Sequence, residues 1–158
     1  MAENRDNDIV IEPRRNRNEK EIPQEGILLV NPTEAHFETE LLRKKSAESR
    51  FLFNSSLYLS SVEKFVAGPA IGAPMAALTM EKLIALGAER IILFGWCGAL
   101  SEELRVGDLV VPDAALSGEG TSQYYTEGDI TPTVHSGLRG KVDQLLQDNG
   151  LRVHSGCI

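Results

Sequence analysis

The sequence has few of the features that mark membrane, secreted or metal-binding proteins. Its 158 residues include only two cysteines, and no Cys or His pair has zinc-site spacing, so we expect no metal. No run reaches the roughly 18–20 apolar residues that a membrane span needs. The start of the chain also has no apolar segment of the kind found in signal peptides. We therefore expect a cytoplasmic protein without a membrane partner.

Positive charge is also scarce. The chain has 16 basic and 23 acidic residues, which gives a formal net charge of −7. Nucleic acids and anionic membranes are bound through basic surfaces, so this balance argues against both as partners. A small anionic ligand held by backbone amides and one or two arginines remains compatible with it. The sequence has no dinucleotide fingerprint, Walker A lysine, nucleophile elbow or HExxH motif in place.

Apolar runs alternate with segments of helical periodicity over residues 26–158, enough for one domain. The expected strands are 26–30, 51–60, 63–67, 90–94, 106–116 and 151–154, and the expected helices are 32–45, 74–86 and 131–149. We expect strand 90–94 to be central, and 51–60 with 63–67 to form a hairpin near the sheet edge. The alternation predicts an α/β layered domain with a mixed, mostly parallel sheet.

Side chains at helical spacing predict which residues of each helix face the core. The expected inward residues are Phe37, Leu41 and Leu42 in the first helix, Ala76, Ala77, Met80, Leu83 and Ile84 in the second, and Val134, Leu138, Val142, Leu145 and Leu146 in the third. Residues 1–25 are rich in charge and Asn and are interpreted as a flexible tail. The alternative is that Ile9–Ile11 joins a neighbour as an edge strand.

Two turns that follow predicted strands suit a small-molecule site. Asn31-Pro32-Thr33-Glu34 combines an N-cap, a proline at the first helical position and a glutamate of the capping-box type. Gly95-Trp96-Cys97-Gly98 follows the strand 90–94, and its glycines permit positive φ or close backbone approach. Right-handed crossovers would bring both turns to one sheet edge, where open α/β sheets bind ligands. The alternative for the second turn is a core turn.

The roles of His36 and of the glycine loop at 68–74 can each be interpreted in two ways. His36, in the first turn of the first helix, would either face the same place as these turns or point to solvent. The glycine loop at 68–74 either lets helix and sheet pack closely or binds a ligand. Its small residues favour the packing interpretation, since a Gly-x-x-x-Gly pattern alone is weak evidence for a ligand.

Five motifs occur in an ordered succession: GPAIGAPMAA at 68–77, LIALGA at 83–88, GWCGAL at 95–100, VGDLVVP at 106–112 and EGTS at 119–122. Together they resemble the nucleoside phosphorylase family, which includes uridine phosphorylases, hexameric purine nucleoside phosphorylases and methylthioadenosine/adenosylhomocysteine nucleosidases. The resemblance spans roughly residues 26–158. It implies a three-layer α/β/α sandwich and a homo-oligomer between dimer and hexamer.

The resemblance also implies a reaction and its ligands. Family members displace a base from C1′ of a nucleoside through an oxocarbenium-like state, with phosphate as nucleophile in phosphorylases and water in nucleosidases. The partner would be a nucleoside or nucleobase, and phosphate is a candidate co-substrate with no cofactor. The protein would hold the nucleophile under the ribose and stabilise the departing base.

Site residues carry over from the family unevenly. The substrate-binding turn corresponds to Gly95, Trp96, Cys97 and Gly98, and the phosphate side to Asn31 and Arg50. Phosphorylases mostly carry Ser or Thr at Trp96 and an arginine at Leu93, so the phosphate side departs from the family. No catalytic residue is assigned in this chain, and His36, near the water-activating glutamate of the nucleosidases, is a candidate base only.

The family segment that supplies a Met-Glu ribose-binding stretch and a catalytic Asp has no counterpart in this sequence. We therefore expect a flexible charged tail at 1–25 and the N-terminal part of a phosphorylase-like domain at 26–158, truncated at its C-terminus. Whether the chain is an enzyme stays open, and alone it is expected to be inactive. The alternatives are a nucleobase-binding module without turnover and a scaffold that self-associates through an unclosed sheet.

Overall fold

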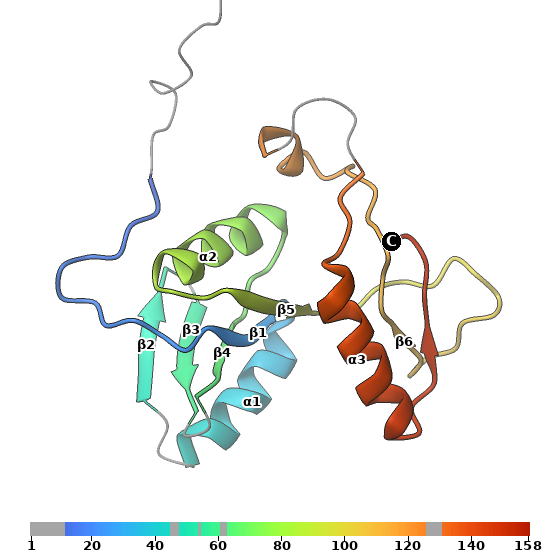
Figure 1. Cartoon of the computed structure of the whole chain (residues 1–158), viewed down its shortest axis with the longest axis horizontal. Helices are drawn as coiled ribbons and strands as arrows, with labels where there is room; N and C mark the ends of the chain where they lie inside the picture. Colours follow the sequence, from blue (N-terminus) through green and yellow to red (C-terminus); the bar gives the residue numbers. More distant parts are fainter. Residues whose placement is uncertain (1–11, 45–47, 54, 61–62, 126–130) are drawn as a thin grey trace, which may run out of the picture. The chain divides into compact units, whose positions relative to one another are not determined.

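The computed structural model describes residues 12–44, 48–53, 55–60, 63–125 and 131–158. They form two compact units that meet in the chain between Trp96 and Cys97, and each is described by itself. The first holds all but two of the described strands (Figure 1). The alternative strand at Ile9–Ile11 lies outside the described residues.

The first unit is a five-stranded mixed sheet between two helices. Its elements are β1 (Glu25–Leu29), α1 (Pro32–Lys44), β2 (Glu48–Leu52), β3 (Ser55–Leu59), β4 (Phe65–Gly68), α2 (Ala73–Ala85) and β5 (Arg90–Phe94). The strand order is β2-β3-β4-β1-β5. β1 is parallel to β4 and β5, and β3 is antiparallel to β2 and β4. Helices α1 and α2 cover opposite faces of the sheet (Figure 1), so the predicted α/β/α layering is confirmed.

The main core lies between the sheet and α2. Leu28, Leu57 and Phe65, each from a different strand, are fully buried. They belong to the same core cluster as Leu83 of α2 and Leu86, which follows α2. Each such side chain contributes about 1.5–3 kcal/mol of burial free energy. Helix α2 ends where predicted, because Gly87 adopts φ 111°, a left-handed conformation that favours glycine at this position.

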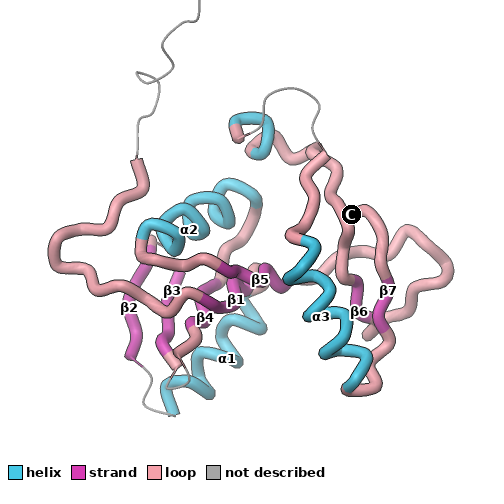
Figure 2. The backbone as a smooth tube through the Cα atoms, in the orientation of Figure 1, coloured by secondary structure: helices cyan, strands magenta, loops and turns pink. Residues whose placement is uncertain are grey.

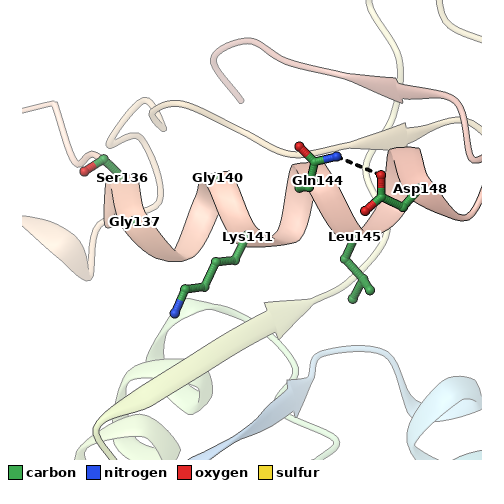
Figure 3. A pocket seen from close by; sticks show the side chains of 7 residues that line it. All are labelled: Ser136, Gly137, Gly140, Lys141, Gln144, Leu145 and Asp148. Carbon is green, nitrogen blue, oxygen red and sulfur yellow. Dashed lines mark hydrogen bonds between the residues drawn. The ribbon is translucent and has the colours of Figure 1, made fainter.

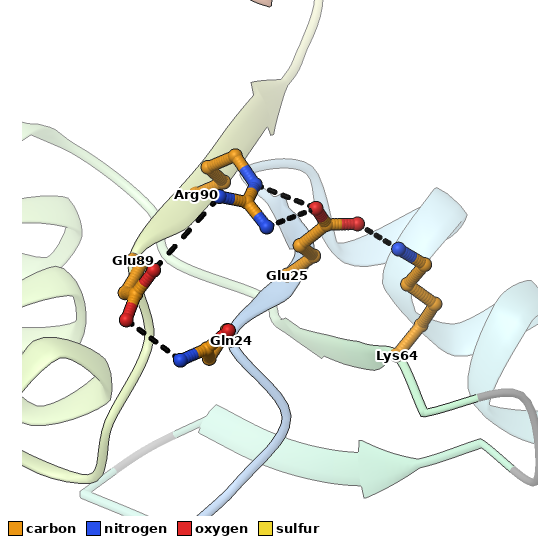
Figure 4. A network of polar contacts seen from close by, with 5 residues as sticks. All are labelled: Gln24, Glu25, Lys64, Glu89 and Arg90. Atoms are coloured by element: carbon orange, nitrogen blue, oxygen red, sulfur yellow. Dashed lines mark hydrogen bonds and ion pairs between the residues drawn. The ribbon is translucent and has the colours of Figure 1, made fainter.

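An ion network pins the amino ends of three neighbouring parallel strands. Glu25 of β1 lies between Lys64, just before β4, and Arg90 of β5, and it forms ion pairs with both (Figure 4). Arg90 also lies 3.8 Å from Glu89, which accepts a hydrogen bond from Gln24. The network opposes register slips, because a one-residue slip would separate the charges.

The segment before β1 is attached to α2, which the charge pattern did not indicate. Lys82 Nζ donates to Glu19 Oε2 at 2.6 Å and to the carbonyl of Arg14 at 2.7 Å. The Lys82 and Glu19 side chains are only 10% and 28% exposed. The Ile22 side chain is buried, and its N–H donates to the carbonyl of Leu86. Residues 12–24 therefore follow the surface of the first unit.

The second unit is smaller and mostly loop (Figure 2). It contains β6 (Leu109–Val110), the 3-10 turn η2 (Ser122–Tyr124), α3 (Ser136–Asp148) and β7 (Val153–His154). β6 and β7 are parallel, and backbone hydrogen bonds continue beyond them to the pair formed by Leu116 and Ile158. The predicted strand 106–116 is thus mostly extended chain paired with residues 152–158.

Several sequence expectations are wrong in detail. β5 lies at the edge of its sheet and pairs only with β1 among the described strands. Phe37 is 64% exposed, since α1 turns Ala35 toward the sheet instead, and Leu41, Ile84, Val134 and Leu145 are also exposed. Helix α3 begins at Ser136 and not at residue 131, because the ring of His135 caps it by accepting from the N–H of Leu138.

Replacing Lys82 with Met tests the attachment of residues 12–24. The change keeps the apolar stem, removes the ammonium and leaves Glu19 without its cationic partner. We expect the free energy of unfolding at pH 7 to fall by about 2–4 kcal/mol. Urea denaturation measures it, with Lys20→Met as the control because Lys20 is exposed. Equal stability of the two variants would contradict the proposed anchoring.

The same ion pair predicts a pH dependence. The hydrogen bond from Lys82, followed by that from the Asn16 amide, holds the pKa of Glu19 below its ordinary value of 4.5. A lowered folded-state pKa stabilises the fold above the unfolded value, and this stabilisation is lost as pH falls through the folded value. Acid titration of Lys82→Met should therefore show a smaller stability loss below pH 4.5 than the wild type.

Candidate substrate site

The predicted site turns meet at the carboxyl ends of two neighbouring parallel strands. Leu29 of β1 pairs with Phe94 of β5, and the N–H of Val30 donates to the carbonyl of Phe94 at 2.9 Å. The chain then leaves β1 through Asn31 and leaves β5 through Gly95. The prediction that both turns share one sheet edge is confirmed, and this is the place where open α/β sheets bind ligands.

A hydrogen bond joins the two turns directly. The backbone N–H of Trp96 donates to Oδ1 of Asn31 at 3.0 Å. Asn31 stands at the N-cap of α1, and its carbonyl accepts from the N–H of Ala35. Its side-chain oxygen is directed to Trp96, not to the first turn of α1 as a capping side chain would be. The Asn31 side chain therefore positions the neighbouring turn.

Gly95 allows the two turns to approach closely at this contact. A Cβ atom built at Gly95 would lie 3.2 Å from Cβ of Val30 and 3.3 Å from Oδ1 of Asn31. Such distances are tighter than most Cβ contacts, so with a side chain at Gly95 the neighbouring atoms would have to move by a few tenths of an ångström. The glycine prediction based on close backbone approach agrees with this geometry.

The exposed surface at this strand end is apolar and aromatic. Trp96 is 70% exposed, Leu93 is 49% exposed and Phe94 is exposed as well. The main chain of Trp96 is held by its hydrogen bond to Asn31, and its ring is exposed to solvent. An exposed indole with a fixed main chain is suited to stacking against a planar ligand.

The remaining predicted site residues belong to other parts of the chain. Cys97, an exposed free thiol, and Gly98 begin the second unit. His36 is exposed on α1, and the hydroxyl of Thr39 donates to its carbonyl. Arg50 lies on β2, at the opposite edge of the sheet from β5, and its guanidinium donates to the carbonyl of Lys20 and to Glu48. The structure brings Asn31 and Trp96 together but does not bring Arg50 to them.

Glu34 is a residue of this region that the sequence argument treated only as a helix cap. Its Oε2 atom is buried and has no hydrogen-bond partner among the described residues. Burying a carboxylate oxygen costs free energy unless a hydrogen-bond donor, from a ligand or from water, lies against it. The signal available in the sequence was an acidic residue in the first turn of a helix that follows a buried strand.

A loop of the second unit is organised by its own glutamate. The Glu119 carboxylate accepts hydrogen bonds from the N–H groups of Thr121 and Ser122, at 2.6 and 2.9 Å. Contacts with Ser122, followed by that with the Thr121 amide, lower the pKa of Glu119 to about 2. The hydroxyls of Ser117 and Ser122 are also hydrogen-bonded to each other. These contacts hold the loop from Ser117 to Ser122 together.

Other features of the described residues do not add to the site. A surface hollow along α3 is lined by Gly137, Gly140, Lys141 and Leu145, with Gln144 bonded to Asp148 (Figure 3). Within the described ranges, no group of three or more His, Cys, Asp or Glu side chains is arranged to hold a metal ion. None of the described helices is long and apolar enough to cross a membrane.

Comparison with known proteins places this geometry in a family. Residues 25–158 match the model of the phosphorylase superfamily. The chain belongs to the phosphorylase superfamily. A guanosine phosphorylase of Halorubrum lacusprofundi is 32% identical over 93 residues, which cover 59% of this chain and 39% of that protein. The chain thus spans well under half the length of this curated relative.

Solved structures of the superfamily share the fold. A uridine phosphorylase from Vibrio fischeri matches with a TM-score of 0.76 and 20% identity, over 87% of this chain and 58% of the other. A purine nucleoside phosphorylase from Toxoplasma gondii, in complex with immucillin-H, matches with a TM-score of 0.75 and 22% identity, over 94% and 61%. Phosphate is the co-substrate of the family's phosphorylases, which need no cofactor, in agreement with the sequence resemblance.

Removing the Asn31 side chain should loosen the turn that carries Trp96. We expect Asn31→Ala to lower the free energy of unfolding by about 1 kcal/mol, because a backbone N–H loses its acceptor. Trp96 is the only tryptophan, so its fluorescence anisotropy should also fall. Asn31→Asp keeps an acceptor oxygen and is the matched control. Unchanged anisotropy in Asn31→Ala would show that the contact does not hold the turn.

The Glu119 loop should respond to acid only at low pH. Between pH 6 and pH 4 we expect the amide NMR shifts of Thr121 and Ser122 to stay constant, because the carboxylate remains ionised until about pH 2. An ordinary glutamate would titrate near 4.5 and move these shifts. Any contribution of this carboxylate to stability is therefore present above 4.5 and lost toward pH 2. Glu119→Gln, which cannot titrate, supplies the reference spectrum.

Proposed function

We propose that this chain binds a nucleoside or nucleobase at the carboxyl ends of β1 and β5, and that the protein cleaves the N-glycosidic bond of a nucleoside. The observation that carries the proposal is the Asn31–Trp96 contact, which presents an exposed indole at the ligand-binding edge of a superfamily member's sheet. The guanosine and uridine phosphorylases among its relatives support a nucleoside as substrate class.

In this proposal the residues divide between base and nucleophile. The Trp96 indole stacks on the base, and stacking of a base on an aromatic ring is worth about 1–3 kcal/mol. Gly95 lets the backbone of the turn come close to the ligand, and Cys97 and Gly98 lie on the base side. Asn31 positions the turn on the phosphate side. Arg50, at the far edge of this chain's sheet, serves the phosphate side of a neighbouring copy, and His36 remains a candidate base.

The chemistry is a displacement at C1′. As the C1′–N bond breaks, its electron pair leaves with the base, and the ribose develops oxocarbenium character before the nucleophile attacks. The protein's contribution is to fix base, ribose and nucleophile in line and to stabilise charge on the departing base. We further propose a cytoplasmic homo-oligomer, because Leu93 and Phe94 are exposed on the strand at the sheet edge.

A second candidate function is nucleobase binding without turnover. It is favoured by the same exposed Trp96 together with Leu93, which places an apolar side chain on β5 two residues before Gly95. The two candidates share the binding step and differ only in base release.

Nucleoside titration of the full chain separates these functions. We expect purine or pyrimidine nucleosides to quench Trp96 fluorescence, and Trp96→Leu to weaken binding by about tenfold or more, measured by calorimetry. Free base is then assayed by chromatography, with and without phosphate. Binding with base release supports the enzyme, and binding without release supports the binding module. A panel that produces neither binding nor release would overturn both, and Phe51→Leu, an exposed aromatic on β2, is the matched control.

A further inference from the structure

The glycine loop at 68–74 lies at the same sheet edge as the Asn31–Trp96 contact. It leaves the carboxyl end of β4, which is the parallel neighbour of β1 on the side away from β5. The N–H of Ala70 donates to the carbonyl of Leu29 at 3.0 Å. The loop is therefore bonded to the last residue of β1, two residues before Asn31, and the ends of three parallel strands meet at this edge.

Close packing holds the first half of this loop. Gly68 adopts φ 147°, and a Cβ atom built there would lie 2.6 Å from the carbonyl oxygen of Leu29. Cβ atoms do not approach other atoms this closely, so a side chain at this position would force β4 and β1 to shift. Ala70 is fully buried and belongs to the main core cluster. The backbone from Gly68 to Ala70 is thus fixed against the sheet.

Ser55 holds the loop from the side of β3. It is the first residue of that strand, whose antiparallel pairing with β4 sets Ser56 opposite Gly68. Ser55 is only 1% exposed, and its hydroxyl donates to the carbonyl of Pro69 at 2.5 Å. Because burying a hydroxyl without a partner costs free energy, this bond ties Ser55 to the loop. The start of β3 is therefore joined to the segment between β4 and α2.

The second half of the loop is exposed and carries an apolar side chain. Ile71 is 60% exposed and directly follows the buried Ala70. In the order β4-β1-β5, Ile71 comes from the strand on one side of β1, and Trp96 comes from the strand on the other side. Neighbouring strands are about 4.8 Å apart, so β4 and β5 are about 10 Å apart. This spacing admits a planar ring between an aliphatic side chain and an indole.

We infer that Ser55 is a positioning residue for the ligand, which holds the glycine loop so that Ile71 contacts the nucleoside on the side opposite Trp96. The inference rests on the proposed function for the identity of the ligand. Trp96 stacks on the base, and Ile71 adds an apolar contact from the end of β4. Ser55 does not touch the ligand but fixes the backbone that precedes Ile71. Fixing this backbone before binding lowers the entropy cost of association.

Calorimetric titration of the full chain with guanosine and with uridine tests the contact. Ile71→Ala should weaken nucleoside binding by about tenfold, because it removes apolar surface that the bound nucleoside covers. Ile84→Ala is the matched control, since Ile84 is also 60% exposed but lies at the far end of α2. This control should bind as the wild type does. Equal binding by the two isoleucine variants would overturn the contact.

A double-mutant cycle tests the role of Ser55. Ser55→Ala should weaken nucleoside binding by about fivefold, because the loop loses one buried hydrogen bond. Combined with Ile71→Ala, it should cause no further loss, since Ser55 acts only through the loop. Lys82→Met, which destabilises the fold at the last turn of α2, should leave the affinity unchanged. Losses that add fully in the double variant would overturn the positioning role.

Hydrogen exchange measured by NMR needs no ligand. In Ser55→Ala the amide of Ala70 should exchange about fivefold faster relative to the amide of Val30, which bonds Phe94 and serves as internal reference. An unchanged ratio would overturn the inference. If neither nucleoside binds the wild type, the proposed function fails, whereas the exchange ratio still decides whether Ser55 holds the loop.

Discussion

The structure of the first unit depends on the pairing of β1 with parallel strands on both sides. β1 lies between β4 and β5, and its register with β5 runs from Glu25–Arg90 at one end to Leu29–Phe94 at the other. The charged residues at the amino end oppose slippage, and the Asn31–Trp96 bond closes the carboxyl end. A register shift of one residue would turn every β1 side chain to the opposite face of the sheet and separate the two turns.

This pairing explains why the candidate site is built from so few side chains. Gly95 contributes only backbone, and a Cβ atom there would make tight contacts with Val30 and Asn31. The Asn31 oxygen is used to hold the N–H of Trp96, so its role is internal positioning. What the edge presents to a ligand is then the Trp96 ring, with Leu93 and Phe94 exposed on the same strand.

Membership of the phosphorylase superfamily rests on the match over residues 25–158, which include both turns of the candidate site. The sequence motifs that carry the resemblance include the turn at 95–100, and the matched segment begins at β1. The described part of the first unit combines that turn with an acidic helix N-terminus and with cations paired at distant positions. The family match therefore establishes the superfamily and the fold, whereas the reaction is what the proposed function assigns.

The sequence by itself determined the α/β class, the helix that begins at Pro32 and the meeting of the two turns, because these follow from local periodicity, helix signals and crossover handedness. The family came from the resemblance of five ordered motifs and from the match over residues 25–158. Only the tertiary structure decided that β5 is an edge strand, that Asn31 Oδ1 binds the Trp96 amide, and that Lys82 holds Glu19. The physical reason is distance along the chain. The partners in these two hydrogen bonds are 65 and 63 residues apart, and no local pattern records which polar groups the packed strands and helices bring into contact.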